Sequence, residues 1–274
     1  MKQKSLLYRI AAAPHILWTV IFIVAPLLFV AYYAFTDTVG NPTTSNILSL
    51  KDHLGTFGLS ISLAVIATFI CLIIGYPLAY CIAKCKPSSQ KILIILVMLP
   101  MWMNLLIRTY SMMAILDDGG FLNGIITSLG GDPVHIVGTS GAVIFGMVYN
   151  FLPYMVIPIY SVISKLDVRL LEASADLGCS PFGMLTKVVV PLSLSGIVSG
   201  VTMVFVPSIS TFYISQKLGG GTFDLIGDTI ERQFQNPSTY NVGAAISLVM
   251  MILILISIAI MNKFSDDAEG EIIV

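Results

Sequence analysis

Cysteine is the first residue type in this sequence that suggests chemistry, because a thiolate is both a nucleophile and a metal ligand. Cys81 and Cys85 lie four residues apart, so a helix would place both on one face, and Cys179 follows in a later polar stretch. Buried cysteine usually behaves as a small hydrophobic side chain. We therefore expect free thiols and no metal site.

The sequence has no arrangement of residues that predicts catalysis. The run Gly219-Gly220-Gly221 is not followed by the Lys-Ser or Lys-Thr pair of a phosphate-binding loop. No nucleophile is paired with a base at a recognisable spacing. We expect no catalytic residues and no cofactor bound by this chain itself.

Polar and aromatic side chains within apolar segments are suited to binding instead. Tyrosine and tryptophan rings attract ammonium groups, and amides and hydroxyls donate and accept hydrogen bonds. The candidate pathway residues are Trp102, Asn104, Tyr149, Asn150, Tyr154, Ser208 and Tyr213. Each would serve equally well to anchor one helix to another or to the membrane interface.

Arg108 is the one formally charged residue within a predicted span. A charge there is costly unless it is paired or faces water. Two roles are open for Arg108. It could line a pathway or hold a gate closed, or it could anchor its helix by snorkelling to the membrane surface or pairing with a carbonyl group. The anchor is the preferred interpretation, because Arg108 lies only about 12 Å along a helix from the span's end at Leu116.

The composition requires a membrane environment. The 274 residues are 56% hydrophobic and 11% charged, with a mean hydropathy of +0.91, whereas soluble domains have about 25% charged residues. Runs free of charge cover residues 10–36, 54–83, 92–107, 136–164, 188–216 and 233–262. The third run stops at Arg108 and resumes to Leu116. Because a spanning helix needs about 20 residues, we predict an all-α protein with six transmembrane helices.

The distribution of Lys and Arg predicts the orientation. With the N-terminus inside, ten basic residues lie on the cytoplasmic side: Lys2, Lys4, Arg9, Lys84, Lys86, Lys91, Lys165, Arg169, Lys187 and Lys263. Three lie outside: Lys51, Lys217 and Arg232. This positive-inside bias predicts a multi-pass membrane protein with both termini in the cytoplasm.

The predicted organisation has three parts. Residues 1–56 hold the N-terminus, the first span and an external loop; residues 57–262 hold a core of five spans; residues 263–274 form an acidic tail expected to be disordered. Prolines at 77, 153, 158 and 207 are expected to kink or locally break their spans. Short helices are expected within residues 121–129 and 224–234.

Residues 167–191 form the longest polar interval on the predicted cytoplasmic side. Asp167 is a suitable N-cap for one short helix, and Gly178 suits its C-terminal corner. Ser180 and Pro181 suit the start of a second helix. Two short helices joined at a glycine, lying across the end of a membrane bundle, predict a docking site for another protein.

The same interval carries a recognisable pattern. Glu172-Ala173-Ser174, three residues, Gly178, and then Val188-Val189-Val190-Pro191 resembles the Glu-Ala-Ala loop of ABC importer permeases. Ser174 replaces the usual second Ala, and Val188 and Val190 replace Ile and Leu. The resemblance implies the type I (MetI-like) permease fold and a place in the plasma membrane, the inner membrane of a bacterial cell. It also implies that Asp167, Glu172, Ala173, Ser174, Asp176 and Gly178 form a coupling helix and its corner, within a loop at residues 167–187, seated on an ATPase.

Further stretches narrow the resemblance. Residues 75–80, 100–110, 152–160 and 171–178 look like those of the PotB-type permease family of spermidine/putrescine importers. That family implies a second, PotC-like permease, a homodimeric PotA-like cytoplasmic ATPase and an external PotD-like polyamine-binding protein. ATP and Mg would be bound by the ATPase, the membrane lipid would surround the spans, and nucleic acid would have no role.

Alternatives to a polyamine importer remain at this point. The predicted external segments hold eight acidic residues against three basic ones, a net charge of −5 that would attract a polycation. Arg108 instead favours an ABC permease for another substrate, such as ferric ion, an anion or a different amine. A secondary transporter would need carboxylates within the membrane, and no Asp or Glu falls in a predicted span.

Overall fold

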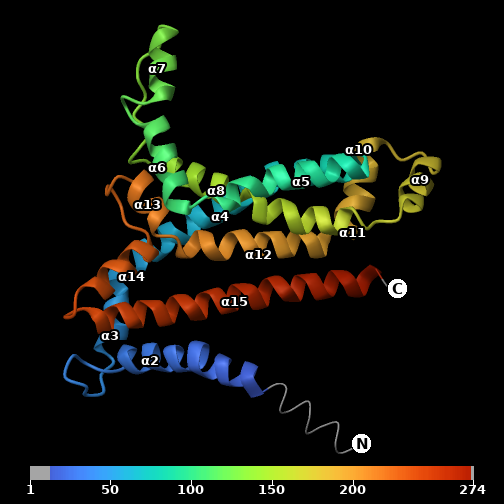
Figure 1. Cartoon of the computed structure of the whole chain (residues 1–274). Coiled ribbons are helices and arrows are strands. Elements are labelled where there is room, and N and C mark those ends of the chain that lie inside the picture. Colours follow the sequence, from blue (N-terminus) through green and yellow to red (C-terminus); the bar gives the residue numbers. More distant parts are fainter. Residues whose placement is uncertain (1–12, 273–274) are drawn as a thin grey trace, which may run out of the picture. The chain divides into compact units, whose positions relative to one another are not determined.

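The chain is built from helices. The computed structural model describes residues 13–272, with side chains described through Lys263. Within these residues the only extended pairing is an isolated bridge between Thr36 and Pro42 (Figure 1). The elements are η1 (Val20–Val24), α2 (Ala25–Ala34), α3 (Ser45–Leu48), η2 (Ser49–His53), α4 (Leu54–Lys84), α5 (Pro87–Trp102), α6 (Leu105–Leu116), α7 (Phe121–Ser128), α8 (Ser140–Ile163), α9 (Val168–Asp176), α10 (Pro181–Met184), η3 (Leu185–Val189), α11 (Val190–Leu192), α12 (Leu194–Ser210), α13 (Tyr213–Leu218), α14 (Ile226–Gln235) and α15 (Tyr240–Ile272).

Four helices are long and apolar enough to cross a membrane, and two bent pairs bring the possible number to six. The four are Ala13–Ala34, Ser45–Lys84, Ser140–Ile163 and Tyr240–Lys263. The bent pairs are Pro87–Trp102 with Leu105–Ser128, at 90°, and Pro181–Leu192 with Leu194–Ser210, at 71°. The predicted all-α membrane fold is confirmed, and its third and fifth spans are the bent ones.

The breaks do not fall where the prolines predicted them. α4 continues through Pro77, and α8 continues through both Pro153 and Pro158. A proline removes a single backbone donor, and neighbouring groups in a packed bundle accommodate the loss. The third span instead bends at Asn104, whose Oδ1 accepts a hydrogen bond from Leu106 N at 2.8 Å and starts a new helix.

Two other boundaries differ from the prediction. The fifth span was expected over residues 188–213, but the straight helix α12 covers only Leu194–Ser210, and Thr211 and Phe212 are not helical. The tail was expected to be disordered, but α15 continues to Ile272. Once a helix is nucleated, each further residue adds a backbone hydrogen bond. The two short helices expected within residues 121–129 and 224–234 are confirmed as α7 and α14.

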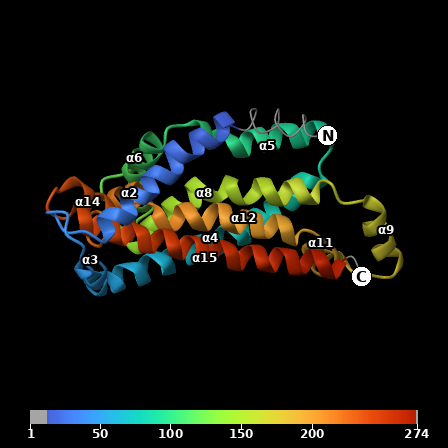
Figure 2. The same cartoon turned by 90° about the horizontal axis from the view of Figure 1, so that it is seen from below.

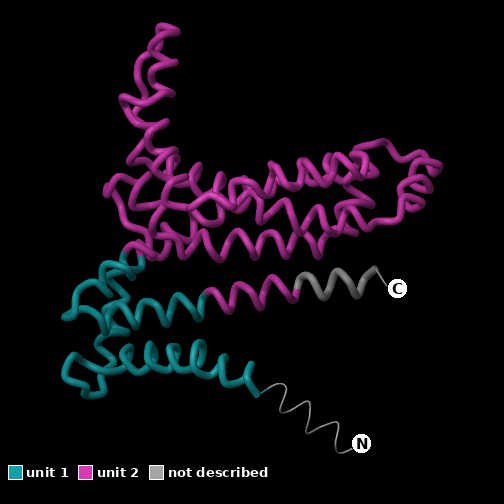
Figure 3. Tube along the Cα trace, viewed as in Figure 1, with its two compact units in different colours: residues 1–54, 229–253 teal, residues 55–228, 254–274 magenta. Residues whose placement is uncertain are grey.

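The chain divides into two compact units (Figure 3). The first comprises residues 1–54 and 229–253. Its contacts include Asn241, whose Nδ2 donates to Thr36 O at 2.6 Å and to Tyr33 O at 3.1 Å. The ring of Tyr240 packs edge-on against Tyr33 at 5.1 Å and Phe234 at 4.8 Å. This unit ties α2 to the start of α15.

The second unit comprises residues 55–228 and 254–274, and α8 lies at its centre. Figures 1 and 2 both show α8 running alongside α12. Their close approach depends on Gly196 and Gly200 of α12, since a Cβ at Gly200 would lie 3.1 Å from Met155 O. The side chain of Met155 is fully buried there.

We expect Gly196→Ala to destabilise the chain by about 1–3 kcal/mol, as over-packing of a filled interface does. A Cβ at Gly196 would lie 3.0 Å from Pro158 O and 3.2 Å from Ile159 Cα, and backbone atoms cannot rotate away. Thermal unfolding of the purified chain in detergent measures the effect. Gly58→Ala in α4 is the matched control, because no heavy atom lies within 4 Å of its added Cβ. Equal unfolding temperatures for the two variants would show that α8 and α12 are not closely packed.

Candidate functional site

The end of the second unit carries the two short helices predicted between residues 167 and 191. Asp167 Oδ1 accepts a hydrogen bond from Arg169 N at 3.0 Å and caps α9. Gly178 has φ +79°, the left-handed conformation that a helix C-terminus commonly requires. Ser180 Oγ then accepts from Gly183 N at 3.1 Å and caps α10. The predicted pair of helices with a glycine corner is confirmed.

The predicted coupling residues are on this pair of helices. Asp167, Glu172, Ala173 and Asp176 are exposed. Ser174 is the exception, because it is 7% exposed and its Oγ donates to Leu171 O at 2.8 Å. Ser174 therefore faces inward, while the acidic side chains of α9 face outward.

Exposed apolar side chains surround these acids. Val168 is 62% exposed, Leu170 48%, Leu177 87% and Phe182 75%. We call these four residues together with Glu172 the α9–α10 surface. Exposed apolar side chains gathered at one place, with charged residues beside them, mark a protein interaction site. None of these four apolar residues was among the predicted coupling residues; their positions beside the acids in the sequence were the available signal.

The pathway candidates are dispersed in the structure. Trp102 is 71% exposed at the end of α5, Tyr149 is 40% exposed and Tyr154 is 36% exposed. Tyr149 and Tyr154 are five residues apart on α8, so they point about 140° apart around the helix. Tyr149 and Tyr154 therefore do not share one face of α8. Asn104 caps α6.

Two further candidates are buried. Ser208 is fully buried, and its Oγ donates to Val204 O at 2.7 Å in its own helix. Asn150 is 1% exposed, and its Nδ2 donates to Gly146 O at 2.8 Å. The Asn150 Oδ1 has no hydrogen-bond partner within the described part of the chain. This oxygen is therefore an unused acceptor in the interior of the second unit.

Arg108 lies buried in α6. Its side chain is 8% exposed, and neither its Nε nor its Nη1 has a hydrogen-bond partner among residues 13–272. Two of the three guanidinium nitrogens therefore lack the carbonyl partner that the anchor interpretation predicts. Arg108, Met112 and Leu116 follow at intervals of four on the buried face of α6. Packing of that face draws the arginine inward along with its apolar neighbours.

Tyr213 is the one pathway candidate that belongs to a clear cluster. Its ring stands edge-on to the ring of Tyr110, with centroids 6.2 Å apart. The Nζ of Lys217 lies 5.2 Å from the Tyr110 centroid and 5.9 Å from the Tyr213 centroid. We call these three residues the tyrosine–lysine cluster. Tyr110 and Lys217 were not among the predicted pathway residues, although the i, i+4 spacing of Tyr213 and Lys217 was a usable signal.

The acidic residues of the loops differ in their exposure. Asp228 is 4% exposed, and its Oδ2 accepts a hydrogen bond from Leu225 N at 2.8 Å. Asp118 is exposed and lies 2.8 Å from His135 Nδ1. Asp37 accepts hydrogen bonds from the backbone of Asn41, which lowers the pKa of its carboxyl group and keeps it ionised. Asp228, one of the eight acidic residues of the predicted external segments, therefore adds no charge to the surface.

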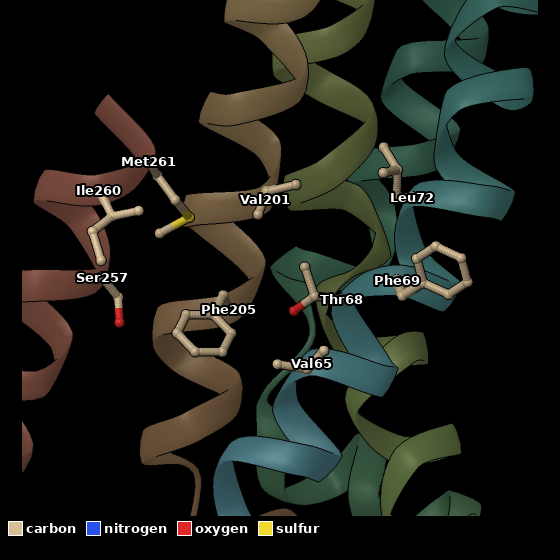
Figure 4. A pocket seen from close by; sticks show the side chains of 9 residues that line it. All are labelled: Val65, Thr68, Phe69, Leu72, Val201, Phe205, Ser257, Ile260 and Met261. Carbon is tan, nitrogen blue, oxygen red and sulfur yellow. The ribbon is translucent and has the colours of Figure 1, made fainter. Parts of the chain in front are cut away.

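One apolar groove of about 390 Å³ lies between α4, α12 and the second half of α15 (Figure 4). Its lining includes Val65, Leu72, Val201 and Ile260, and none of its lining residues is charged. The Thr68 hydroxyl within it donates to Ala64 O at 2.7 Å, inside its own helix. The groove has the chemistry of a lipid-facing surface and offers no counter-charge to an ionic substrate.

Comparison with known proteins places these features in a family. Residues 75–268 match the family model described as the binding-protein-dependent transport system inner membrane component. The chain is 36% identical over 251 residues to the spermidine/putrescine transport system permease protein PotB of Haemophilus influenzae, covering 88% of each chain. It is 37% identical over 246 residues to the Escherichia coli protein of the same name, covering 86% of this chain and 90% of that protein.

The fold has a close counterpart among solved structures. A chain from the crystal structure of a bacterial ABC transporter involved in the import of the acidic polysaccharide alginate matches with a TM-score of 0.77. The match covers 97% of this chain and 96% of that one, at 18% sequence identity, so it supports the fold alone. The capped helix pair, the bent spans and the matched family model all indicate the same kind of membrane protein. This chain is a multi-pass membrane protein that belongs to the family of binding-protein-dependent transport system inner membrane components.

Proposed function

We propose that this chain is a permease subunit of an ATP-driven polyamine importer that takes up spermidine or putrescine. The supporting observation is its 36–37% identity, over nearly the whole of both chains, to permeases named for spermidine/putrescine transport. The chain would form half of the translocation pathway. ATP hydrolysis, with its Mg, would belong to a separate ATPase.

The α9–α10 surface is the proposed contact with that ATPase. It lies at the end of the bundle that the positive-inside rule assigns to the cytoplasm. Leu177 and Phe182 are exposed enough to enter a groove of a partner, and Glu172 makes no ion pair within the described residues. ATP-driven closure of the ATPases would move α9 and α10, and through them the bent fifth span, in a rigid-body step.

The complete transporter would have four kinds of component. We propose a second, PotC-like permease, a PotA-like ATPase dimer and an external PotD-like protein that delivers the polyamine. The N- and C-termini of this chain would lie in the cytoplasm. The exposed acids of the outer loops would raise the local concentration of a polycation near the entrance.

The test is uptake of labelled spermidine and putrescine by cells that lack native polyamine import. The chain is expressed with all three candidate partners and with each partner omitted in turn. We expect saturable uptake with the complete set and background uptake when any one is missing. Expression of each component is checked in the membrane or periplasmic fraction, so that an absent protein is not mistaken for an inactive one.

A second candidate substrate is an anion, and the buried guanidinium of Arg108 favours it. The same cells distinguish the two. Background uptake of both polyamines by a fully assembled complex, together with ATPase stimulation by an anion-loaded binding protein, would move the substrate to the anionic class and leave the permease fold unchanged.

A further inference from the structure

The tyrosine–lysine cluster is a preformed site for an ammonium group. Cation–π attraction acts when a cation lies within about 6 Å of a ring centroid, and the Nζ of Lys217 meets this condition for both rings at 5.2 and 5.9 Å. The rings of Tyr110 and Tyr213 are inclined at 77° to each other. The negative faces of the two rings therefore meet the Lys217 Nζ from two different directions.

The cluster is held rigidly by the packing behind it. Ile214 and Leu218 of α13 are fully buried, and a Cβ at Gly146 of α8 would lie 2.4 Å from Leu218 Cδ1. Gly138 N also donates to Leu218 O at 2.7 Å. Because α13 is anchored by one face, its Tyr213 and Lys217 project together from the other.

The site is open to a ligand. Tyr110 is 48% exposed, and Lys217 is partly exposed. The helices that carry the cluster, α6 and α13, lie at the end of the second unit opposite α9 (Figure 1). The hydrogen bond with the Tyr110 hydroxyl raises the pKa of Lys217, so the resident group is an ammonium at neutral pH.

We propose that the rings of Tyr110 and Tyr213 bind a terminal primary ammonium of the substrate, and that Lys217 is a tethered competitor which the substrate must displace. The inference rests on the proposed polyamine transport and assigns this site to it. Two ammonium groups cannot share the position because like charges repel at this separation. Displacement therefore frees the Lys217 side chain to swing into water as the substrate enters. Both tyrosine rings then bind the substrate ammonium in place of the Lys217 ammonium.

The direct test is the accessibility of Lys217 in the assembled transporter in nanodiscs. The complex is treated briefly with an amine-acetylating reagent, with and without spermidine, and acetylation at each lysine is measured by mass spectrometry. We expect spermidine to increase acetylation of Lys217 about two- to fivefold. This is the change in the population of free Lys217 side chains that loss of one exposed cation–π contact would cause. Lys51 is the matched control, because it is exposed and makes no cation–π contact within residues 13–272. 1,4-Butanediol, which lacks the charge, is the control ligand.

Uptake kinetics in proteoliposomes provide the second test. Lys217→Gln is expected to raise kcat/KM for the loaded binding protein about two- to fivefold, whereas Lys217→Arg, which keeps a cation at the rings, changes it less. Tyr110→Leu combined with Tyr213→Leu is expected to lower kcat/KM and to abolish the effect of Lys217→Gln. Phenylalanine at both positions keeps the rings and is expected to retain most of the activity.

The outcomes separate this inference from the proposed function. Polyamine uptake by the wild type with unchanged Lys217 acetylation, or with no gain from Lys217→Gln, would overturn the site and leave the transport function intact. Spermidine-dependent acetylation of Lys217 without any polyamine uptake would support the ammonium site and overturn the proposed function.

Discussion

Charge reversal at Glu172 is expected to abolish polyamine uptake and ATPase association while leaving the membrane bundle folded. Glu172 is exposed in the middle of α9, surrounded by exposed apolar side chains, and makes no ion pair within residues 13–272. Its loss therefore costs the isolated chain little. At an interface, like charges placed opposite each other cost several kcal/mol of association free energy. Co-purification of the ATPase with tagged Glu172→Lys permease measures the loss.

Asp52→Lys is the matched control for this prediction. Asp52 is an exposed acid in η2, on the predicted external side, so the change in net charge is identical. We expect the control to retain the ATPase. Co-purification and uptake that survive Glu172→Lys would remove the α9–α10 surface from the coupling mechanism. Loss of the ATPase in both variants would point to a general effect of charge.

Arg108→Met is expected to stabilise the purified chain. The guanidinium is 8% exposed, and its Nε and Nη1 have no partner in the described residues. A buried donor without a partner costs about 1–3 kcal/mol, and methionine fills a similar volume without that cost. The thermal unfolding temperature of the purified permease should therefore rise. Arg108→Lys, which keeps a charge at the same place, should give no such rise.

Transport by the Arg108 variants tests the residue's role separately from its stability. If Arg108 belongs to the pathway or its gate, Arg108→Met lowers uptake in the assembled transporter even though the chain is more stable, a known trade-off at functional sites. A lower unfolding temperature for Arg108→Met would show that the guanidinium finds a partner after all. Unchanged uptake would remove Arg108 from the candidate pathway.

Local sequence determined much of this fold. The capping residues Asp167 and Ser180 and the corner at Gly178 predicted α9 and α10 because a cap and a left-handed glycine act within one helical turn. The apolar runs predicted the spanning segments because their length must match the bilayer. The prediction that prolines break their spans was wrong for α4 and α8. Whether Pro153 breaks α8 depends on neighbouring helices that the local sequence does not reveal.

The sequence by itself determined that this is a membrane protein, that it is all-helical, and that a loop with the Glu-Ala-Ala pattern follows α8 and precedes the bent fifth span. Each of these features depends on composition or on a short-range pattern. Only the tertiary structure decided the surroundings of individual side chains. It buried Arg108 with no partner for its Nε or Nη1 within residues 13–272, buried Asp228 beside Leu225 N, and placed the Lys217 ammonium against two tyrosine rings. Tyr110 and Tyr213 are about a hundred residues apart in the chain, and they meet because α13 packs against α6. Contacts at that separation arise from the packing of whole helices, which no local pattern encodes.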